Sequence, residues 1–150
     1  MLKVRPVIPA DYPRWRELFD AYMRFYEREP DEAIAKHVWS RILDPAAPVY
    51  AAAAEVDGRV EGITNYLLHE TTFGTGLVCY LQDLFVDPST RARGIGKALI
   101  DWVIAEMERN GWLRVFWHTR ETNYRARGLY DKYTPHSGFL RYVVPNSRAG

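Results

Sequence analysis

YLQDLFVDPSTRARGIGKAL, residues Tyr80–Leu99, carries the strongest structural signal in the chain. It passes from an apolar strand through a proline turn into a glycine-containing loop, and a long amphipathic helix follows. Gly94 and Gly96 stand where that helix begins. The first backbone N–H groups of a helix have no partner inside it and lie at the positive end of its dipole. Because glycine has no Cβ to keep a phosphate away, the stretch predicts an anion-binding cradle.

Two common phosphate-binding loops are excluded by position. A P-loop needs a glycine five residues before its Gly-Lys pair and a Ser or Thr after the lysine. Here the pair is Gly96-Lys97, with Arg91 five residues before the glycine and Ala98 after the lysine, so no hydroxyl is placed for Mg²⁺. A dinucleotide-binding loop needs a third glycine, and Leu99 stands at its position.

The composition is that of a folded protein, with 150 residues, 47% of them apolar and 26% charged, and a net charge of +1. We expect one domain over residues 1–150, long enough for a core of its own. The small, scattered charge argues against a nucleic-acid-binding protein, which usually carries a clustered basic surplus. No apolar run approaches the ~20 residues that cross a bilayer, and the N-terminus has no signal-peptide core, so we expect no membrane partner.

Cysteine and histidine usage narrows the chemistry further. Cys79 is the one cysteine, which excludes an internal disulfide and favours a reducing, cytoplasmic location. The four histidines, His37, His69, His118 and His136, stand far apart and no cysteine pair accompanies them. The sequence therefore predicts no metal site.

Hydrophobic periodicity predicts strands and helices in the order β-α-α-β-β-β-α-β-α-β, an α/β sandwich with a mixed central sheet flanked by helices. The expected strands cover Leu2–Val7, Val49–Val56, Arg59–Leu68, Leu77–Val86, Leu113–Trp117 and Phe139–Val144. Helices are expected to begin at Ala10–Asp11, at about Asp31, after Gly94 and at Thr122, the last running to about Lys132. Pro6 favours an edge position for the first strand, and Asp57-Gly58 is a strong hairpin signal.

Two motifs carry a resemblance to a known family. Arg91-x-x-Gly94-x-Gly96, after a strand that ends in Val86-Asp87-Pro88, resembles the pyrophosphate-binding signature of the GNAT superfamily of N-acetyltransferases. A second stretch has an Asn, an Ala three residues on, an aliphatic–Tyr pair and a Gly-Phe, as GNAT enzymes typically do. Its residues here are Asn123, Ala126, Leu129-Tyr130 and Gly138-Phe139. The element order matches the GNAT fold across nearly the whole chain, so the resemblance implies an acetyl-CoA-dependent enzyme.

The resemblance also implies which residues hold the donor. They are Leu84, Phe85, Val86, Arg91, Ala92, Arg93, Gly94, Ile95, Gly96, Lys97, Asn123 and Tyr130. The pantetheine arm would pair with the strand end Leu84–Val86, and a backbone N–H near Leu84 would stabilise the oxyanion. Tyr130 would protonate the departing sulfur, although its helical spacing alone also fits simple packing. Tyr133, three residues on, is better explained by packing or substrate contact.

The group that deprotonates the amine is less defined. Gln82-Asp83 resembles the Glu-Asp pair of spermidine/spermine N-acetyltransferases, but Gln82 takes up no proton. Asp83, His118 and bulk water remain as candidates, and Gln82 and Asp83 are also expected to contact the acceptor. Asp83 could instead be a hydrogen-bonded structural carboxylate. The acidic residues Glu27, Glu29, Asp31 and Glu32 hint at a cationic acceptor or form a solvated helix connection.

The sequence therefore predicts an N-acetyltransferase that uses direct transfer from acetyl-CoA to a small-molecule amine in a ternary complex. An acyl-CoA-binding sensor of the same fold without turnover is the main alternative, and a nucleotide-binding protein is a third. Many relatives form dimers, and the five Trp and ten Tyr residues leave room for a homodimer interface.

Overall fold

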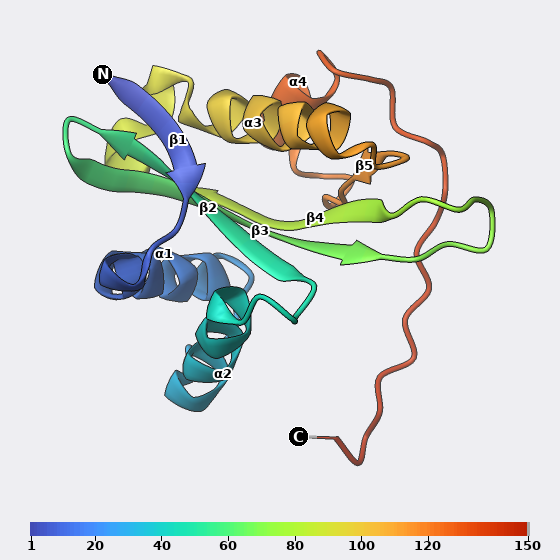
Figure 1. The fold of residues 1–150 in the computed structure, drawn as a ribbon, viewed down its shortest axis with the longest axis horizontal. Coiled ribbons are helices and arrows are strands. Elements are labelled where there is room, and N and C mark those ends of the chain that lie inside the picture. The colour runs from blue at the N-terminus through green and yellow to red at the C-terminus, as the bar shows by residue number, and fades with distance from the viewer. Residues whose placement is uncertain (150) are drawn as a thin grey trace. The chain divides into compact units, whose positions relative to one another are not determined.

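The structure, a computed structural model, describes residues 1–149 except for the side chains of Arg91 and Ala92. The chain forms two compact units, Met1–His118 and Thr119–Gly150. The first unit contains the sheet and most of the helices, and the second contains a single short helix and an extended tail (Figure 1). Among residues 1–149, no helix has both the length and the apolar character needed to cross a membrane.

The elements follow the expected order as far as the last helix. In the first unit they are β1 (Leu2–Pro6), η1 (Pro9–Asp11), α1 (Tyr12–Phe25), α2 (Glu32–Leu43), β2 (Val49–Val56), β3 (Arg59–His69), β4 (Val78–Val86), η2 (Pro88–Arg93), α3 (Ile95–Asn110) and β5 (Val115–Phe116). The second unit contains α4 (Tyr124–Tyr130). Here η1 and η2 are short 3₁₀ helices.

The five strands form one mixed sheet in the order β1-β2-β3-β4-β5. β1 to β4 are antiparallel to their neighbours, whereas β5 runs parallel to β4. β1 lies at an edge, as Pro6 predicts, because an edge strand needs no amide donor on its outer side. Asp57 and Gly58 join β2 to β3 with φ values of 50° and 85°, the left-handed conformations of a tight Asp-Gly hairpin.

Helices α1 and α2 cover one face of the sheet (Figure 1). Their Trp15, Phe19 and Trp39 pack with Ile63 of β3 in one buried cluster. Trp15 is fully buried, and its ring lies 4.7 Å from that of Phe19 in a stacked arrangement. This aromatic packing fixes α1 against the sheet, which matters because α1 also contacts the candidate site.

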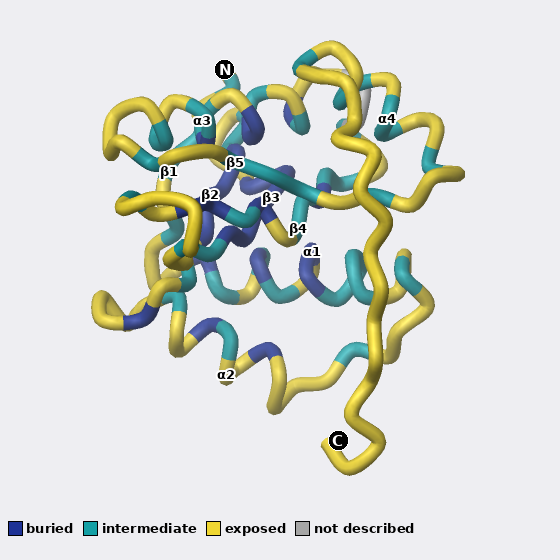
Figure 2. Tube along the Cα trace, turned by 90° about the vertical axis from the view of Figure 1, so that its right-hand side faces the viewer, coloured by how far each residue is buried: buried dark blue, intermediate teal, exposed yellow. Residues whose placement is uncertain are grey.

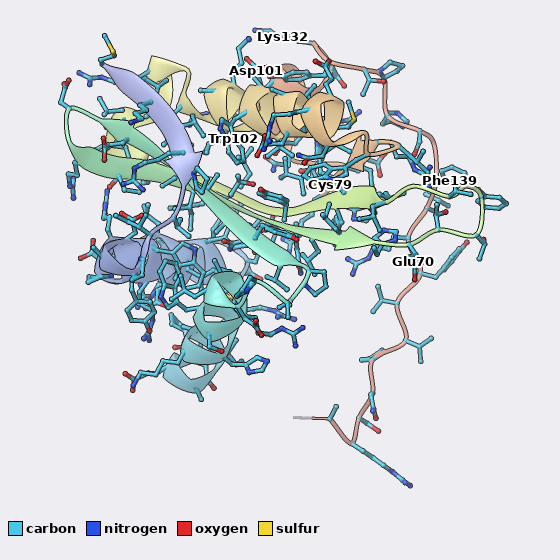
Figure 3. All side chains as sticks on the ribbon, viewed as in Figure 1. Glu70, Cys79, Asp101, Trp102, Lys132 and Phe139 are labelled. Carbon is cyan, nitrogen blue, oxygen red and sulfur yellow. The ribbon has the colours of Figure 1, made fainter. Side chains whose placement is uncertain are left out.

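Helix α3 covers the opposite face. Ile95 and Leu99 are fully buried and pack with Ala54 of β2. Asp101 lies on the outer side of α3, and Trp102 lies on its side toward the sheet (Figure 3). Figure 2 shows that the buried residues gather in the central strands and on the inner sides of these helices.

The C-terminal part of the chain differs most from prediction. The helix expected over Thr122–Lys132 is shorter, Tyr124–Tyr130, and the strand expected over Leu113–Trp117 has only the two residues of β5. The strand expected over Phe139–Val144 is wrong, because the described residues after Tyr130 form no further helix or strand. Phe139 is 92% exposed. An apolar, β-branched composition favours an extended backbone, but a strand also needs a neighbour that satisfies its hydrogen bonds.

Candidate functional site

The glycine loop that is predicted to form an anion cradle lies at the junction of η2 and α3. Gly94 is the N-cap of α3 and has a φ of 71°, a left-handed conformation that glycine adopts without strain. No capping side chain occupies the start of α3. A Cβ built on Gly94 would meet no atom within 4 Å, so the space beside this residue is open. The first N–H groups of α3 are therefore available to an anion.

The other predicted cradle residues contribute in different ways. The Ile95 side chain is fully buried in the core, so only its backbone can face a ligand. Arg93 is exposed. Lys97 forms an ion pair with Asp101 at 2.7 Å, one turn along the helix. The side chains of Arg91 and Ala92 lie outside the described residues, and their assignment remains a prediction.

A charged cluster holds the loop that leads to the cradle. Asp87 caps η2 by accepting hydrogen bonds from the Ser89 N–H at 2.9 Å and the Ser89 hydroxyl at 2.8 Å. The Arg14 guanidinium of α1 donates to the other oxygen of Asp87 at 2.7 Å, and it lies 3.4 Å from Glu61 of β3. The hydrogen bond from Arg14 has the largest effect on the pKa of Asp87 and, together with the hydrogen bonds from Ser89, lowers it to about 2. α1 and β3 thus both anchor the end of β4.

β4 carries one residue more than β3 at its middle. Asn65 of β3 pairs with Asp83 and Tyr66 pairs with Leu81, so Gln82 is left without a partner in the ladder. Such a β-bulge bends the strand and changes the direction of the side chains on either side of it. Gln82 is exposed, as suits a residue available to a ligand.

Beyond the bulge, one edge of β4 is open. β5 pairs only with Cys79 and Tyr80, and within the part of the chain that the structure describes no strand lies beside Leu81–Val86 on that edge. A strand edge without a neighbour presents unpaired N–H and C=O groups. It can therefore bind an extended chain through main-chain hydrogen bonds.

The hydrogen-bonding pattern indicates which residues serve this edge. The Asp87 N–H donates to the Glu61 carbonyl at 2.8 Å, toward β3. In an antiparallel pair the bonded residues alternate, so the backbone groups of Phe85 also point to β3. Those of Leu84 and Val86, between them, point to the open edge. The side chains of Leu84 and Val86 pack toward α3 and that of Phe85 toward α1, so these residues meet a ligand at the edge through their backbone.

Asp83 lies at the end of a buried chain of hydrogen bonds. The Trp15 indole N–H donates to the Asn65 Oδ1 at 3.0 Å, and the Asn65 amide donates to Asp83 Oδ2 at 2.9 Å. The Tyr22 hydroxyl donates to the Gln82 carbonyl at 3.3 Å. Burial raises the pKa of Asp83, while hydrogen bonds from Asn65 and Tyr22 oppose the rise. Asp83 is thus a hydrogen-bonded carboxylate with an increased tendency to take up a proton.

His118 lies at the end of the first unit and is exposed. Its Nδ1 lies 3.3 Å from the Tyr80 hydroxyl, and the two rings meet edge to face at 5.4 Å. No group of three or more His, Cys, Asp and Glu side chains within residues 1–149, apart from the side chains not described, could hold a metal ion.

Asn123 and Tyr130 lie in the second unit, at the two ends of α4. Asn123 is the N-cap residue, and its amide donates to the Thr119 hydroxyl at 3.0 Å instead of capping the helix. Tyr130 and Tyr133 are both half-buried. The first unit brings the cradle, the open edge and Asp83 into one strand–loop–helix segment, and the approach of Asn123 and Tyr130 to them remains a prediction.

The acidic segment between α1 and α2 has structural roles of its own. Asp31 caps α2 by accepting a hydrogen bond from the Ile34 N–H at 3.1 Å. Glu32 forms an exposed ion pair with Lys36 at 3.4 Å. These contacts favour the solvated helix connection over a dedicated cation site.

Sequence reasoning missed Arg14, Asn65 and Tyr22. Asn65 had a detectable signal, because it is a polar residue inside the apolar run Ile63–Leu68 and a buried amide needs partners. Arg14 and Tyr22 gave no signal of this kind, since each contacts a residue 60 or more positions away in the chain, in β4 for Tyr22 and just after it for Arg14.

Known proteins resemble this chain along most of its length. The family model described as "Acetyltransferase (GNAT) family" matches residues 13–134. The D-amino-acid N-acetyltransferase HPA3 of Saccharomyces cerevisiae is 30% identical over 131 residues, covering 86% of this chain and 81% of that protein. The N-acetyltransferase YhfO of Bacillus subtilis, itself uncharacterized, is 27% identical over 145 residues, covering 95% and 97%.

Solved structures agree on the fold. The aminoglycoside acetyltransferase meta-AAC0020, from an uncultured soil metagenomic sample, has a TM-score of 0.81 at 20% identity and covers 97% of both chains. At that identity the likeness concerns the fold alone. The matched family model and the 30%-identical relative together show that the chain belongs to the GNAT family and is an acetyltransferase.

Proposed function

We propose that this enzyme transfers an acetyl group from acetyl-CoA to the primary amine of a small acceptor by direct attack, with donor and acceptor bound together. The open edge of β4, followed at once by the glycine loop at the start of α3, carries this proposal. An extended pantetheine arm can add to such an edge as a further strand. Its pyrophosphate would then meet the first N–H groups of α3, where the helix dipole favours negative charge.

The Leu84 N–H is our candidate oxyanion donor. As the amine attacks, the thioester carbonyl oxygen gains negative charge that a fixed backbone donor can stabilise by about 3 kcal/mol. The alternation along β4 supports this role, because Leu84 follows a residue bonded to β3 and its N–H points to the open edge.

Asp83 is our candidate for accepting the amine proton. An alkylammonium has a pKa near 10.4, so only about one molecule in a thousand is neutral at pH 7. Burial raises the pKa of Asp83, which brings this carboxylate closer to the range of an effective base. Gln82, beside it at the bulge, could only hydrogen-bond the acceptor. His118, or water, is the alternative proton acceptor.

Tyr130 is our candidate for protonating the leaving group. The amine nitrogen forms a bond to the carbonyl carbon, and the carbon–sulfur bond then breaks to release a thiolate. A thiol pKa near 8.5 and a tyrosine pKa near 10 make proton transfer from the hydroxyl modestly uphill, so geometry decides its value. Asn123, seven residues earlier, would contact the donor.

The alternative is a sensor that binds acyl-CoA without turnover, which the absence of a glutamate at Gln82 favours. Free-thiol release from acetyl-CoA, measured with polyamines, amino acids, aminoglycosides and basic peptides, separates the two. Turnover with any amine supports the enzyme. Tight CoA binding without turnover would favour the sensor.

The cradle can be tested with two glycines of one helix. Gly94 and Gly111 flank α3 with φ values of 71° and 72°, and neither would place a Cβ within 4 Å of another atom. Changing either to alanine imposes the same left-handed strain, about 1 kcal/mol. We expect both variants to lose similar stability and only Gly94→Ala to bind CoA more weakly, measured by calorimetry. Equal CoA affinity in the two variants would count against the cradle.

The leaving-group assignment has a matched control in the same segment. Tyr130→Phe should lower kcat by about 100-fold or more, the contribution of a well-placed general acid, while CoA affinity stays nearly unchanged. Tyr133→Phe, three residues on, should leave kcat close to that of the wild type. Unchanged turnover in Tyr130→Phe would remove this residue from the mechanism.

We further propose that residues 1–150 act as a single N-acetyltransferase domain, since the family model at residues 13–134 extends across both compact units. We propose a cytoplasmic location because the one cysteine, Cys79, is buried and forms no disulfide. We propose a homodimer because many GNAT enzymes form dimers. Sizing by light scattering would test the dimer.

A further inference from the structure

Four rings form a partly exposed aromatic shelf at the end of the sheet, consisting of His69, Tyr80, Phe116 and His118. Tyr80 and Phe116 face each other across β4 and β5, stacked with centroids 4.9 Å apart and planes 5° from parallel. His118 meets both rings edge to face, at 5.4 Å and 5.7 Å. His69 meets Phe116 edge to face at 5.9 Å. Tyr80 and Phe116 are half-buried and the two histidines are exposed, so the shelf presents ring surface to solvent.

The shelf lies on the same face of the sheet as Asp83. Asn65 points to the α1 face, because its amide oxygen accepts a hydrogen bond from Trp15, and Leu67, two residues along β3, points to the same face. Leu67 pairs with Tyr80, and paired residues share a face. Asp83, paired with Asn65, is therefore on the face of Tyr80, even though three positions separate them in the chain.

Aromatic residues of α1 stand on the other side of Asp83. Tyr22 donates to the Gln82 carbonyl and its ring lies 5.0 Å from Tyr26, which in turn lies 5.2 Å from Phe25. Phe25 is 54% exposed. The carboxylate of Asp83 is thus flanked by ring systems both along β4 and along the end of α1.

This arrangement favours one kind of amine. A polyamine needs several carboxylates, but the acids of the neighbouring helix connection include one that caps α2 and one that pairs with Lys36. The buried carboxylates of Asp11 and Glu61 on this side of the sheet already form ion pairs, with Arg5 and with Arg14 and Arg59. The half-buried Asp83 instead accepts a hydrogen bond from the neutral Asn65 amide, on the face that carries the ring surface. Tyr80 and Asp83 are separated by about 10 Å or less at the rise of a strand, a span that a short alkyl chain between a ring and an amine can bridge.

We propose that the acceptor is an arylalkylamine, whose ring lies on the aromatic shelf while its amino group lies beside Asp83. The inference rests on the proposed function, because Asp83 must lie where the amine reacts. Ring–ring contacts supply selectivity beyond the burial of apolar area, since offset and edge-to-face pairs are favourable. In this assignment the stacked rings of Tyr80 and Phe116 determine specificity, and Asp83, rather than His118, accepts the amine proton.

The test compares 2-phenylethylamine, n-butylamine and spermidine by thiol release from acetyl-CoA. We expect kcat/KM for 2-phenylethylamine to exceed that for n-butylamine by about tenfold or more, the selectivity of a pocket for an added apolar group. Phe116→Leu keeps the apolar volume and removes the ring, so this ratio should fall about fivefold. Phe73→Leu, at a 92% exposed ring outside the shelf, is the control and should leave the ratio unchanged.

The outcomes distinguish a failure of the arylalkylamine assignment from a failure of the proposed function. Equal use of 2-phenylethylamine and n-butylamine, or a preference for spermidine, would overturn the arylalkylamine assignment and leave acetyl transfer intact. A ratio that falls equally in Phe116→Leu and Phe73→Leu would overturn the role of the shelf. Acetyl-CoA binding without turnover of any amine would overturn the proposed function and this inference with it.

Discussion

Replacing Arg14 with methionine should destabilise the protein by about 2 kcal/mol at pH 7. The guanidinium lies 2.7 Å from Asp87 and 3.4 Å from Glu61, and these side chains are only 20% and 6% exposed. Removing one partner of a fully buried ion pair costs about 3–5 kcal/mol, because the other charge stays buried and unpaired. The loss is smaller here, since Asp87 keeps its bonds to Ser89 and Glu61 keeps an ion pair with Arg59 at 2.9 Å.

The same change should alter how stability depends on pH. Asp87 has its pKa lowered from 3.8 to about 2, mainly by Arg14. A lowered pKa in the folded state adds stability that is complete above the unfolded value and is lost as the pH falls through the folded one. Without Arg14 most of this contribution is gone at every pH. The stability difference between wild type and variant should therefore shrink as the pH is lowered from 5 toward 2.

Urea denaturation at a series of pH values measures both effects. Lys36→Met is the control, because Lys36 lies on a helix and pairs with Glu32 one turn away at 3.4 Å, with both side chains mostly exposed. Such pairs contribute little, so this variant should unfold almost as the wild type does. The reasoning fails if Arg14→Met costs no more than Lys36→Met, or if its cost stays constant with pH.

Three further variants test the core and Asp83. Gly62→Ala should cost about 1–2 kcal/mol in urea denaturation, because its Cβ would lie 2.8 Å from Ile95 Cγ2 and 3.2 Å from Leu99 Cδ1. Ile95→Ala, at a fully buried site, should cost about 3 kcal/mol alone and less in the Gly62→Ala background, where the new methyl fills part of the cavity. Asp83→Asn should lower kcat by about 100-fold, measured by thiol release. Because burial raises the pKa of Asp83, wild type loses stability as the pH rises through that value, so the stability of Asp83→Asn relative to wild type should increase from pH 4 to pH 7.

Features encoded by a few neighbouring residues could be predicted from the sequence. The Asp57-Gly58 hairpin and the start of α2 at Asp31 follow from local backbone preferences, and both are confirmed. The left-handed Gly94 at the start of α3 belongs to the same class. Here side-chain chemistry and backbone geometry are determined within one turn of chain, so no distant partner has to be known.

Features that need a distant partner could not be predicted in this way. Arg14 binds Asp87, which lies 73 residues later in the chain, and no sequence pattern around either residue indicates the pair. Phe139–Val144 has the composition of a strand but forms no ladder, because pairing depends on which backbone edge is available. The same limit applies to the approach of Tyr130 to the cradle.

The bulge at Gln82 changes how the central strand should be interpreted. In a regular strand Tyr80 and Asp83 would lie on opposite faces, because their separation is odd. The extra residue reverses the alternation, so that the carboxylate and the aromatic ring share the face covered by α1. Gln82 lies outside the ladder, and the bulge beside it places Asp83 on the face covered by α1. Under the proposed mechanism, in which Asp83 accepts the amine proton, the departure from the Glu-Asp pattern amounts to a shift of the proton acceptor by one position, at a local irregularity that sequence periodicity does not reveal.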